Sequence, residues 1–195
     1  MGQIPKILWI FYIFLISTTY GDPKAEFTIQ SPRVTTYGIW GGPDRCPPDT
    51  FTSGFRLRSE PAQGAYDDDS ALNAIELVCT SSEGNQIAQI SSLQGGLGTW
   101  GPVISCPSNK LITGFQLRSE AEQGPFDNTA ANNLRIRCGQ SDSDYEWIEG
   151  DGKTSWGDWT AEQYCPRGMA ICGIRTQVQV YDHQSKIFSK ILIST

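Results

Sequence analysis

Histidine is almost absent from this sequence: of its 195 residues only His183 is a histidine, and it lies close to the C-terminal end. Nucleophilic catalysis by a Ser-His-Asp or Cys-His arrangement needs an imidazole base. Apart from His183 the chain has no residue that could be this base. Closely spaced Cys or His pairs that would hold structural zinc are missing, and so is a Gly-x4-Gly-Lys phosphate loop. We therefore assign no catalytic residue and predict no metal ion and no cofactor.

Long apolar runs are also lacking. Residues 7–16 are apolar or aromatic without interruption, follow Lys6, and precede small and polar residues up to Gly21. A membrane-spanning helix needs about 20 such residues, whereas a positive start, a short apolar core and a small-residue exit are typical of a secretory signal peptide. We predict a signal peptide over residues 1–21 and a secreted, extracellular protein that is not embedded in a membrane. A membrane anchor is the alternative.

Basic residues are in the minority, with 15 Lys and Arg against 21 Asp and Glu, for a net charge of -6. A nucleic-acid partner would require a basic surface, so we exclude nucleic acid. Apolar residues at helical spacing are absent as well, while glycine is abundant and β-branched and aromatic residues cluster in short runs. This composition predicts an all-β protein.

Three copies of one unit occupy most of the remaining chain, at residues 36–79, 96–138 and 154–179, followed by an atypical tail at 180–195. Each unit has a tryptophan six residues before a Cys-Pro pair and a glycine eight residues after that cysteine. We expect the units to form a single domain over residues 22–195. The shared residues are Trp40, Trp100 and Trp159, then Cys46, Cys106 and Cys165, and finally Gly54, Gly114 and Gly173.

Apolar and polar residues alternate within each unit, as in GFRLR at 54–58 and LRIRC at 134–138. Such alternation is typical of strands with one buried and one solvated face. A single sheet cannot bury its apolar face alone. The repeat therefore predicts three antiparallel sheets that pack around a shared core.

The six cysteines are read as disulfides because the chain is predicted to be exported. Bonds Cys46–Cys79 and Cys106–Cys138 would close equivalent loops in the first two units, each contributing roughly 3–4 kcal/mol. Six cysteines allow fifteen pairings, and the equivalence of the units favours this one. Cys165 and Cys172 lack equivalent partners: they could bond each other, remain as thiols, or bridge to another chain.

The carboxylates before the last strand of each unit are interpreted as turn formers. Asp68 aligns with Asp127, but the next position holds Asp69 in one unit and Asn128 in the other. Asp and Asn share the ability to hydrogen-bond nearby backbone, whereas a catalytic carboxylate would not tolerate Asn. A calcium site is a weaker alternative, because the ligand spacing of an EF-hand loop is absent.

A glycoside hydrolase would need two carboxylates roughly 5–9 Å apart across a sugar-binding cleft. The residues that recur with the repeat are more often scaffold than catalytic machinery, so we treat these carboxylates as candidates for glycan contact only. They are Glu60, Asp67, Asp68, Glu120 and Asp127.

The tryptophans allow two interpretations, since aromatic rings fill cores and also provide flat faces on which sugars stack. Trp40, Trp100 and Trp159 occupy one repeat position, which predicts a place in the core. Trp147 and Trp156 fall outside that position, so they are the aromatic candidates for glycan contact.

The Trp-x5-Cys-Pro start, the Gly-Phe strand and the closing phrase DDDSALNAIELVC resemble the vitelline membrane outer layer protein I family over residues 36–179. The resemblance implies a β-prism of three four-stranded Greek-key sheets with pseudo-threefold symmetry. It also implies an extracellular protein of the egg vitelline membrane or of secreted fluids. The family is associated with a transferase-like activity on chitooligosaccharides, without agreed catalytic residues.

The C-terminal tail departs from the family pattern, because the glycine-rich turn, the repeated acidic phrase and two closing cysteines are missing after residue 179. We therefore expect an incomplete third sheet, with the apolar segment 187–193 as an exposed aggregation risk.

Together these observations predict a secreted structural component of an extracellular coat or fluid. Its expected partners are extracellular matrix or egg-coat proteins and N-acetylglucosamine-containing glycans. A transferase or hydrolase acting on N-acetylglucosamine oligosaccharides and a non-catalytic, lectin-like module are the alternatives.

Overall fold

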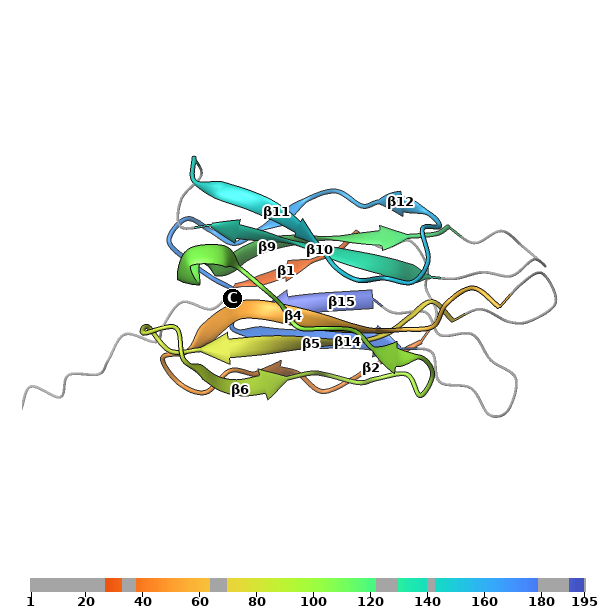
Figure 1. Cartoon of the computed structure of the whole chain (residues 1–195), viewed down its shortest axis with the longest axis horizontal. Coiled ribbons are helices and arrows are strands. Elements are labelled where there is room, and N and C mark those ends of the chain that lie inside the picture. The colour runs from red at the N-terminus through yellow and green to blue at the C-terminus, as the bar shows by residue number, and fades with distance from the viewer. Residues whose placement is uncertain are drawn as a thin grey trace, which may run out of the picture.

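Three antiparallel sheets form the sides of a prism whose strands run along the long axis of the molecule (Figure 1). The computed structural model describes residues 27–32, 38–63, 70–121, 130–139, 143–178 and, for the backbone alone, 190–194. The only helical element in these ranges is the 3-10 turn η1, Pro107–Asn109. No helix in the described ranges is long and apolar enough to cross a membrane.

Each sheet contains five strands, of which two short ones share one edge. Sheet one consists of β6 (Gln86–Ile90), β5 (Leu72–Thr80), β4 (Phe51–Ser59), β7 (Thr99–Trp100) and β8 (Ile104–Ser105). Sheet two consists of β11 (Tyr145–Glu149), β10 (Ala131–Gly139), β9 (Leu111–Ser119), β12 (Asp158–Trp159) and β13 (Gln163–Tyr164). Sheet three consists of β1 (Thr28–Gln30), β15 (Lys190–Ser194), β14 (Gly173–Val178), β2 (Ile39–Trp40) and β3 (Asp44–Arg45).

The strand order β6-β5-β4-β7 in sheet one, and its counterpart β11-β10-β9-β12 in sheet two, is that of a Greek key. The predicted all-β prism of three Greek-key sheets is therefore confirmed. The sheets differ from the repeat units in one respect: each sheet contains strands from more than one unit. The Trp-to-Cys segment that opens each unit pairs with a strand of the neighbouring sheet, as β7 and β8 do with β4.

The expectation of an incomplete third sheet was wrong. The tail supplies β15, which lies between β14 and the N-terminal strand β1, so its residues 190–193 are in the interior of the sheet and not at an exposed edge. Sheet three has the same number of strands as the others, but β14 and β15 span six and five residues where β4 and β5 span nine each. Both ends of the described chain thus meet in this sheet.

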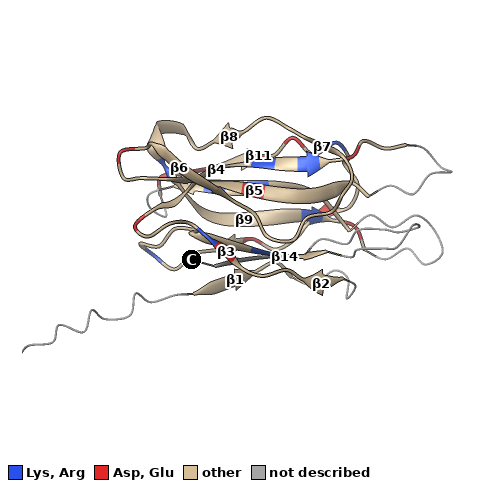
Figure 2. Ribbon diagram, turned by 90° about the horizontal axis from the view of Figure 1, so that it is seen from below, with Lys and Arg blue, Asp and Glu red and all other residues tan. Residues whose placement is uncertain are grey.

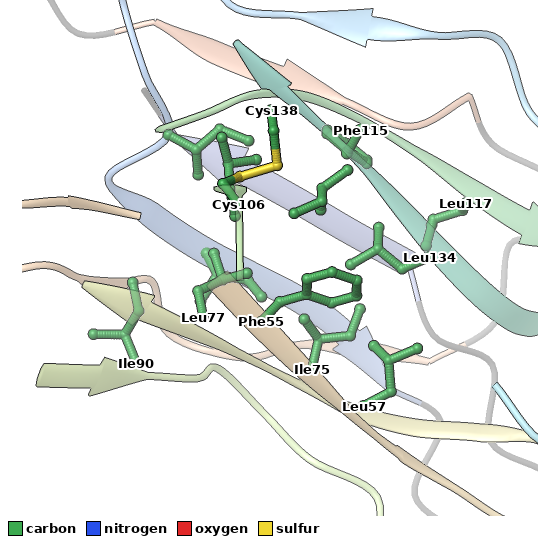
Figure 3. Packing of buried hydrophobic residues seen from close by; sticks show 14 of the residues in the cluster. Phe55, Leu57, Ile75, Leu77, Ile90, Cys106, Phe115, Leu117, Leu134 and Cys138 are labelled. Carbon is green, nitrogen blue, oxygen red and sulfur yellow. A yellow bond between two sulfur atoms is a disulfide. The ribbon is translucent and has the colours of Figure 1, made fainter. Parts of the chain in front are cut away.

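The core lies between the three sheets and follows the alternation in the sequence. Figure 3 shows Phe55, Phe115 and Leu134 meeting between sheets one and two, and all three are fully buried. Ile174 is the equivalent core residue of β14 and is equally buried. Each such side chain contributes roughly 1.5–3 kcal/mol on burial.

Both disulfides join neighbouring sheets. Cys46 follows β3 of sheet three and bonds Cys79 of β5 in sheet one, and Cys106 follows β8 of sheet one and bonds Cys138 of β10 in sheet two. The pairing in the structure is the one that the repeat predicts. Because of the exchange of strands between units, each bond fastens two sheets together instead of closing a loop within one.

Cys165, the third cysteine at this repeat position, has no disulfide to a neighbouring sheet. Cys165 follows β13, as Cys46 and Cys106 follow β3 and β8, but neither Cys165 nor Cys172 is disulfide-bonded, and both lie in the described part of the chain. Cys165 nevertheless packs against the core.

Candidate functional site

The predicted carboxylate turns are only partly in view. Asp67, Asp68 and Asp127 lie outside the described residues, so their interpretation as turn formers stays a prediction. The adjoining residues are described, and they form scaffold contacts. The hydroxyl of Ser70 donates a hydrogen bond to the Glu60 carboxylate at 2.6 Å, and the amide of Asn73 donates to the Ser70 hydroxyl at 2.7 Å.

The backbone at the two repeated glutamates makes the same contact in both sheets. The N–H of Glu60 donates to the carbonyl of Ala71, and that of Glu120 donates to the carbonyl of Ala130, both at 2.8 Å. In each case the bond ties the end of one long strand to the start of the next. Glu60 and Glu120 therefore stand at a structurally equivalent strand end.

The repeated tryptophans are not core residues, which corrects the prediction. They lie half-buried on the outer faces of the sheets, outside the core cluster, each with an arginine guanidinium over its ring. The cause is the direction of the side chains in the sheet. Trp100 is paired with Arg58, so the two side chains lie on the same face, and that of Arg58 faces away from the core. The three distances from guanidinium carbon to ring centre are 4.7 Å for Arg56–Trp100, 4.8 Å for Arg135–Trp159 and 5.1 Å for Arg175–Trp40.

Sheet two obtains its arginine from a different strand than the other two sheets. In sheet one Arg56 of β4 stacks on tryptophan and pairs with Glu76 of β5 at 2.6 Å. In sheet two the same cross-strand pair is Gln116 of β9 and Arg135 of β10, so the cation has changed strands. The stack on tryptophan is preserved although the residue that provides it is not.

The outer face of sheet two carries more aromatic surface than this shared pattern requires. Arg135 lies between two tryptophans, at 5.1 Å from the ring of Trp147 and 4.8 Å from that of Trp159. We call this set, with the next row of Tyr145, Arg137 and Tyr164, the aromatic face. In that row Arg137 lies 4.1 Å and 5.4 Å from the two tyrosine rings, respectively.

The aromatic face is accessible to a ligand. Tyr145 is 47% exposed and Tyr164 is 45% exposed, while Trp147 is half-buried and lies 6.3 Å from Tyr164 between ring centres. Trp147, a predicted contact residue, is thus part of a larger cluster. The tyrosines were missed in the sequence, although their positions in strands with outward-facing neighbours could have indicated them.

Trp156, the other aromatic candidate, is 36% exposed and precedes the turn at Gly157. It shares no ring contact with the aromatic face in the described structure. The structure therefore separates the two tryptophans that the sequence grouped together.

A cleft of about 500 Å³ adjoins the aromatic face at the end of the prism where β5 turns into β6, at the left in Figure 1. Arg137 reaches it from β10, and the loop from Cys165 to Ala170 forms one wall. We call it the Arg137 cleft. Burial raises the pKa of the Cys165 thiol in this wall to about 12, with a further increase from Cys172 that outweighs the opposing charge of Arg137.

A second, shallower hollow of about 510 Å³ lies at the start of β12. Trp159, Glu120 and Asp158 line it, together with neighbouring residues of β9 and β12 and with Pro32 after β1. It combines an aromatic ring with two carboxylates. Among the described residues no group of three or more His, Cys, Asp or Glu side chains is close enough to hold a metal ion.

Charged side chains are mixed over the molecule. Figure 2 shows Lys and Arg interspersed with Asp and Glu along the strands and turns. The aromatic face follows this mixture, since Arg135 lies 4.0 Å from Glu162 and is paired in register with Glu149.

Comparison with known proteins identifies the family. A family model described as vitelline membrane outer layer protein I matches residues 27–188. The chain belongs to this family. Two members are named vitelline membrane outer layer protein 1 homolog: the mouse protein is 39% identical over 160 residues, covering 81% of this chain and 76% of its own length. The human protein is 41% identical over 172 residues, covering 85% and 80%, respectively.

Solved structures support the fold of this family member at low sequence identity. The agglutinin of Calystegia sepium has a TM-score of 0.52 and is 12% identical, with 86% of this chain and 95% of that chain covered. The Calsepa lectin in complex with a biantennary N-glycan has a TM-score of 0.50 at 12% identity and the same coverage. At this identity the likeness shows the fold alone.

Proposed function

We propose that the protein is a secreted, non-enzymatic component of an extracellular coat or fluid, and that it binds glycans or matrix proteins through the outer faces of its sheets. The family is named for the outer layer of the vitelline membrane, and the predicted signal peptide agrees with export. Disulfides that fasten neighbouring sheets suit a protein that must keep its shape outside the cell.

One observation carries the proposal: the aromatic face of sheet two is not required by the fold. By register, Trp147 corresponds to Gln89 of sheet one, and Tyr164 corresponds to Ser105. Sheet one thus forms the same structure with polar residues there. Exposed aromatic side chains that a scaffold does not need are typical of a contact surface.

Glycan is a reasonable partner for such a face, because the apolar C–H side of a sugar ring packs on aromatic rings and its hydroxyls bond to neighbouring polar groups. A prism of related architecture forms a complex with a biantennary N-glycan, so this architecture is compatible with a glycan site. The N-acetylglucosamine-containing glycans predicted as partners fall within this class.

The enzymatic alternative predicts turnover that depends on carboxylates. We expect the secreted protein, incubated with N-acetylglucosamine oligomers, to leave their length distribution unchanged by mass spectrometry. A glycan array with the same protein should show retention that is lost in Trp147→Gln and preserved in the double variant Asp67→Asn/Asp68→Asn. Turnover that disappears in the double variant would overturn the non-enzymatic proposal and favour a transferase or hydrolase.

A further inference from the structure

We infer that Tyr145 is a modification site whose phenol oxygen is esterified with sulfate while the protein passes through the secretory pathway. The inference rests on the part of the proposed function that assigns export to this chain. In the reaction the phenol oxygen bonds to the sulfur of an activated sulfate donor, a phosphosulfate anhydride, as the bond from that sulfur to the donor's phosphate oxygen breaks. The phenol proton passes to a base of the transferase, so no oxidant or reductant is required.

Tyr145 is accessible in the folded protein. It is the first residue of β11, which ends the strand order of sheet two among the described strands and lies along the upper edge in Figure 1. The residue is 47% exposed. An edge strand directs backbone N–H and C=O groups away from its sheet, and an extended groove of another protein can pair with them. A transferase can therefore reach both the side chain and the backbone at this position.

The sequence around Tyr145 is acidic and contains no basic residue. Between Arg137 and Lys153 it holds five Asp and Glu and no Lys or Arg. The corresponding stretch of sheet one, residues 79–93, holds a single acid, Glu83, so the scaffold does not require this charge. Because the sulfate donor is itself an anion, the site that binds it must be basic, and such a site attracts an acidic acceptor segment.

The carboxylates beside Tyr145 stay exposed although cations lie nearby. Lys110 lies 2.7 Å from Asp144 and 3.8 Å from Glu146, but the lysine side chain is 16% exposed, against 59% and 48% for the two acids. Solvent therefore meets mainly carboxylate here, and exposed ion pairs of this kind contribute little to stability, so a basic groove can replace Lys110. The guanidinium of Arg137 lies over the Tyr145 ring, 4.1 Å from its centre, whereas the phenol oxygen is at the rim of the ring.

The fold does not need a tyrosine at this position. Tyr145 is paired with Gly139 in sheet two, and the corresponding pair in sheet one is Gln86 with Thr80. Sheet one thus begins the same edge strand with a side chain that cannot accept sulfate. An exposed phenol that the scaffold can do without, within an acidic segment, indicates a site for modification.

Tyr164 provides a comparison within the same molecule. It is 45% exposed and its ring also lies near Arg137. Within five residues on either side it has one acid, Glu162, and one base, Arg167, whereas Tyr145 has four acids and no base over the same span. Exposure is therefore equal for the two tyrosines, and the charge of the neighbouring residues distinguishes them.

The test is accurate-mass peptide mapping of the protein collected from the medium of secretory animal cells. After reduction, trypsin cleaves behind Arg137, Lys153 and Arg167, so that Tyr145 and Tyr164 are each the single tyrosine of one peptide. We expect the mass of one SO3 on the peptide 138–153 and no added mass on the peptide 154–167. The added mass should disappear when sulfate activation in the cells is blocked with chlorate.

Labelling with radioactive sulfate tests the residue and its neighbours. Tyr145→Phe should lose the label, and Tyr164→Phe, the matched control, should retain it in full. The double variant Asp144→Asn/Glu146→Gln keeps the acceptor and should lower the label severalfold, because less charge attracts the segment to a basic enzyme. Circular dichroism of the secreted variants shows whether they fold, and the map of the wild-type protein decides the question even where one does not.

Secreted protein with an unmodified peptide 138–153 would overturn the inference and leave the proposed function standing. Phosphate in place of sulfate, recognised by its accurate mass and its removal by phosphatase, would overturn it as well. So would equal modification of Tyr145 and Tyr164, because the acidic segment would then not select the acceptor. Protein that remains inside the cell would remove both the inference and the export on which the proposed function depends.

Discussion

At the scale of single residues, identical spacing in three units conceals different roles. A tryptophan at one repeat position packs outward under an arginine in every sheet, while the cysteine that follows it is bonded in two sheets and reduced in the third. Residues that recur serve the scaffold, and departures from the repeat, such as Arg137 at the position of Val78, are where function is to be sought.

The first residue-scale prediction concerns the thiol of Cys165. Its pKa is raised to about 12, chiefly by burial and then by Cys172, from an ordinary value of 9.0. We expect iodoacetamide to modify it slowly at pH 8 in the folded protein and rapidly in urea, because the thiolate is the nucleophile. Fast modification under native conditions would contradict the burial of this side chain.

The same shift fixes a dependence of stability on pH. Above about pH 9 the unfolded chain loses the proton of Cys165, while the folded chain retains it until about pH 12. Since the folded state then binds more protons, the free energy of unfolding should fall as pH rises through this window and be unaffected below it. Urea titrations at pH 8 and 10.5 should show a smaller fall for Cys165→Ser than for the wild type.

A second residue-scale prediction concerns the glycine two positions before each repeated tryptophan. Gly98 has φ +78°, and a Cβ built on it would lie 2.5 Å from the carbonyl of Ser59. Gly98→Ala should therefore lower the free energy of unfolding by about 1–3 kcal/mol through strain and overpacking. Gly96→Ala is the control in the same loop, because nothing lies within 4 Å of that Cβ; an equal loss in both variants would refute the steric explanation.

At the scale of elements, much of the structure was readable from the sequence. Alternation in residues 54–58 and 134–138 located the buried faces of β4 and β10, and the unit spacing gave the pairing of Cys46 with Cys79 and of Cys106 with Cys138. These features are local or follow from symmetry. They depend on period-two side-chain direction and on equivalent loops, which a sequence displays directly.

Other elements could not be read in this way, because their pairing depends on contacts between distant segments. The sequence gives no sign that β7 and β8 pair with β4 of the preceding unit, or that β1 and β15 complete sheet three. The tail lacks the family phrase, yet backbone hydrogen bonding in a sheet tolerates many side chains, so a different sequence fills the same strand position. The clustering of Tyr145, Trp147 and Tyr164 likewise required the register.

The register of β15 leads to an element-scale prediction. Leu192 pairs with Arg175 as Glu76 pairs with Arg56, and the second cysteine of the unit, Cys79, stands three residues after Glu76. Three residues after Leu192 the sequence has Thr195, which lies outside the described residues.

The variant Thr195→Cys should therefore form a third disulfide with Cys165 and raise stability by roughly 3 kcal/mol, with the usual range of 0–5. Non-reducing peptide mapping should show the new cross-link, and Cys165→Ser in the same background should abolish the gain. A variant that retains both thiols after oxidation would show that the end of β15 does not follow the symmetry.

At the scale of the whole molecule, three sheets exchange strands so that each is held to its neighbour by backbone hydrogen bonds, and two of the three boundaries are also closed by disulfides. The boundary between sheets two and three has no disulfide, and Cys165, which stands at the position of the bonded cysteines, also lines the Arg137 cleft. A stiff prism with one distinctive corner is consistent with the proposed role in contact rather than catalysis.

The bond between sheets one and two provides a test of this arrangement. The double variant Cys106→Ala/Cys138→Ala should lose roughly 3–4 kcal/mol of unfolding free energy, measured in urea under non-reducing conditions. The same pair of changes at Cys46 and Cys79 should cost a similar amount, because the loops are 32 and 33 residues long. A loss of unfolding free energy below about 0.5 kcal/mol in both variants would mean that the disulfides are not needed to hold the sheets together.

The most direct test of the account is non-reducing peptide mapping of the secreted protein by mass spectrometry, with thiol labelling before and after unfolding. We predict a mature N-terminus near residue 22, cross-links Cys46–Cys79 and Cys106–Cys138, and a Cys165 thiol that is labelled only after unfolding. Cross-links that join Cys165 to a cysteine of another unit, or a protein that remains inside the cell, would contradict the stapled, exported prism on which the proposed site depends.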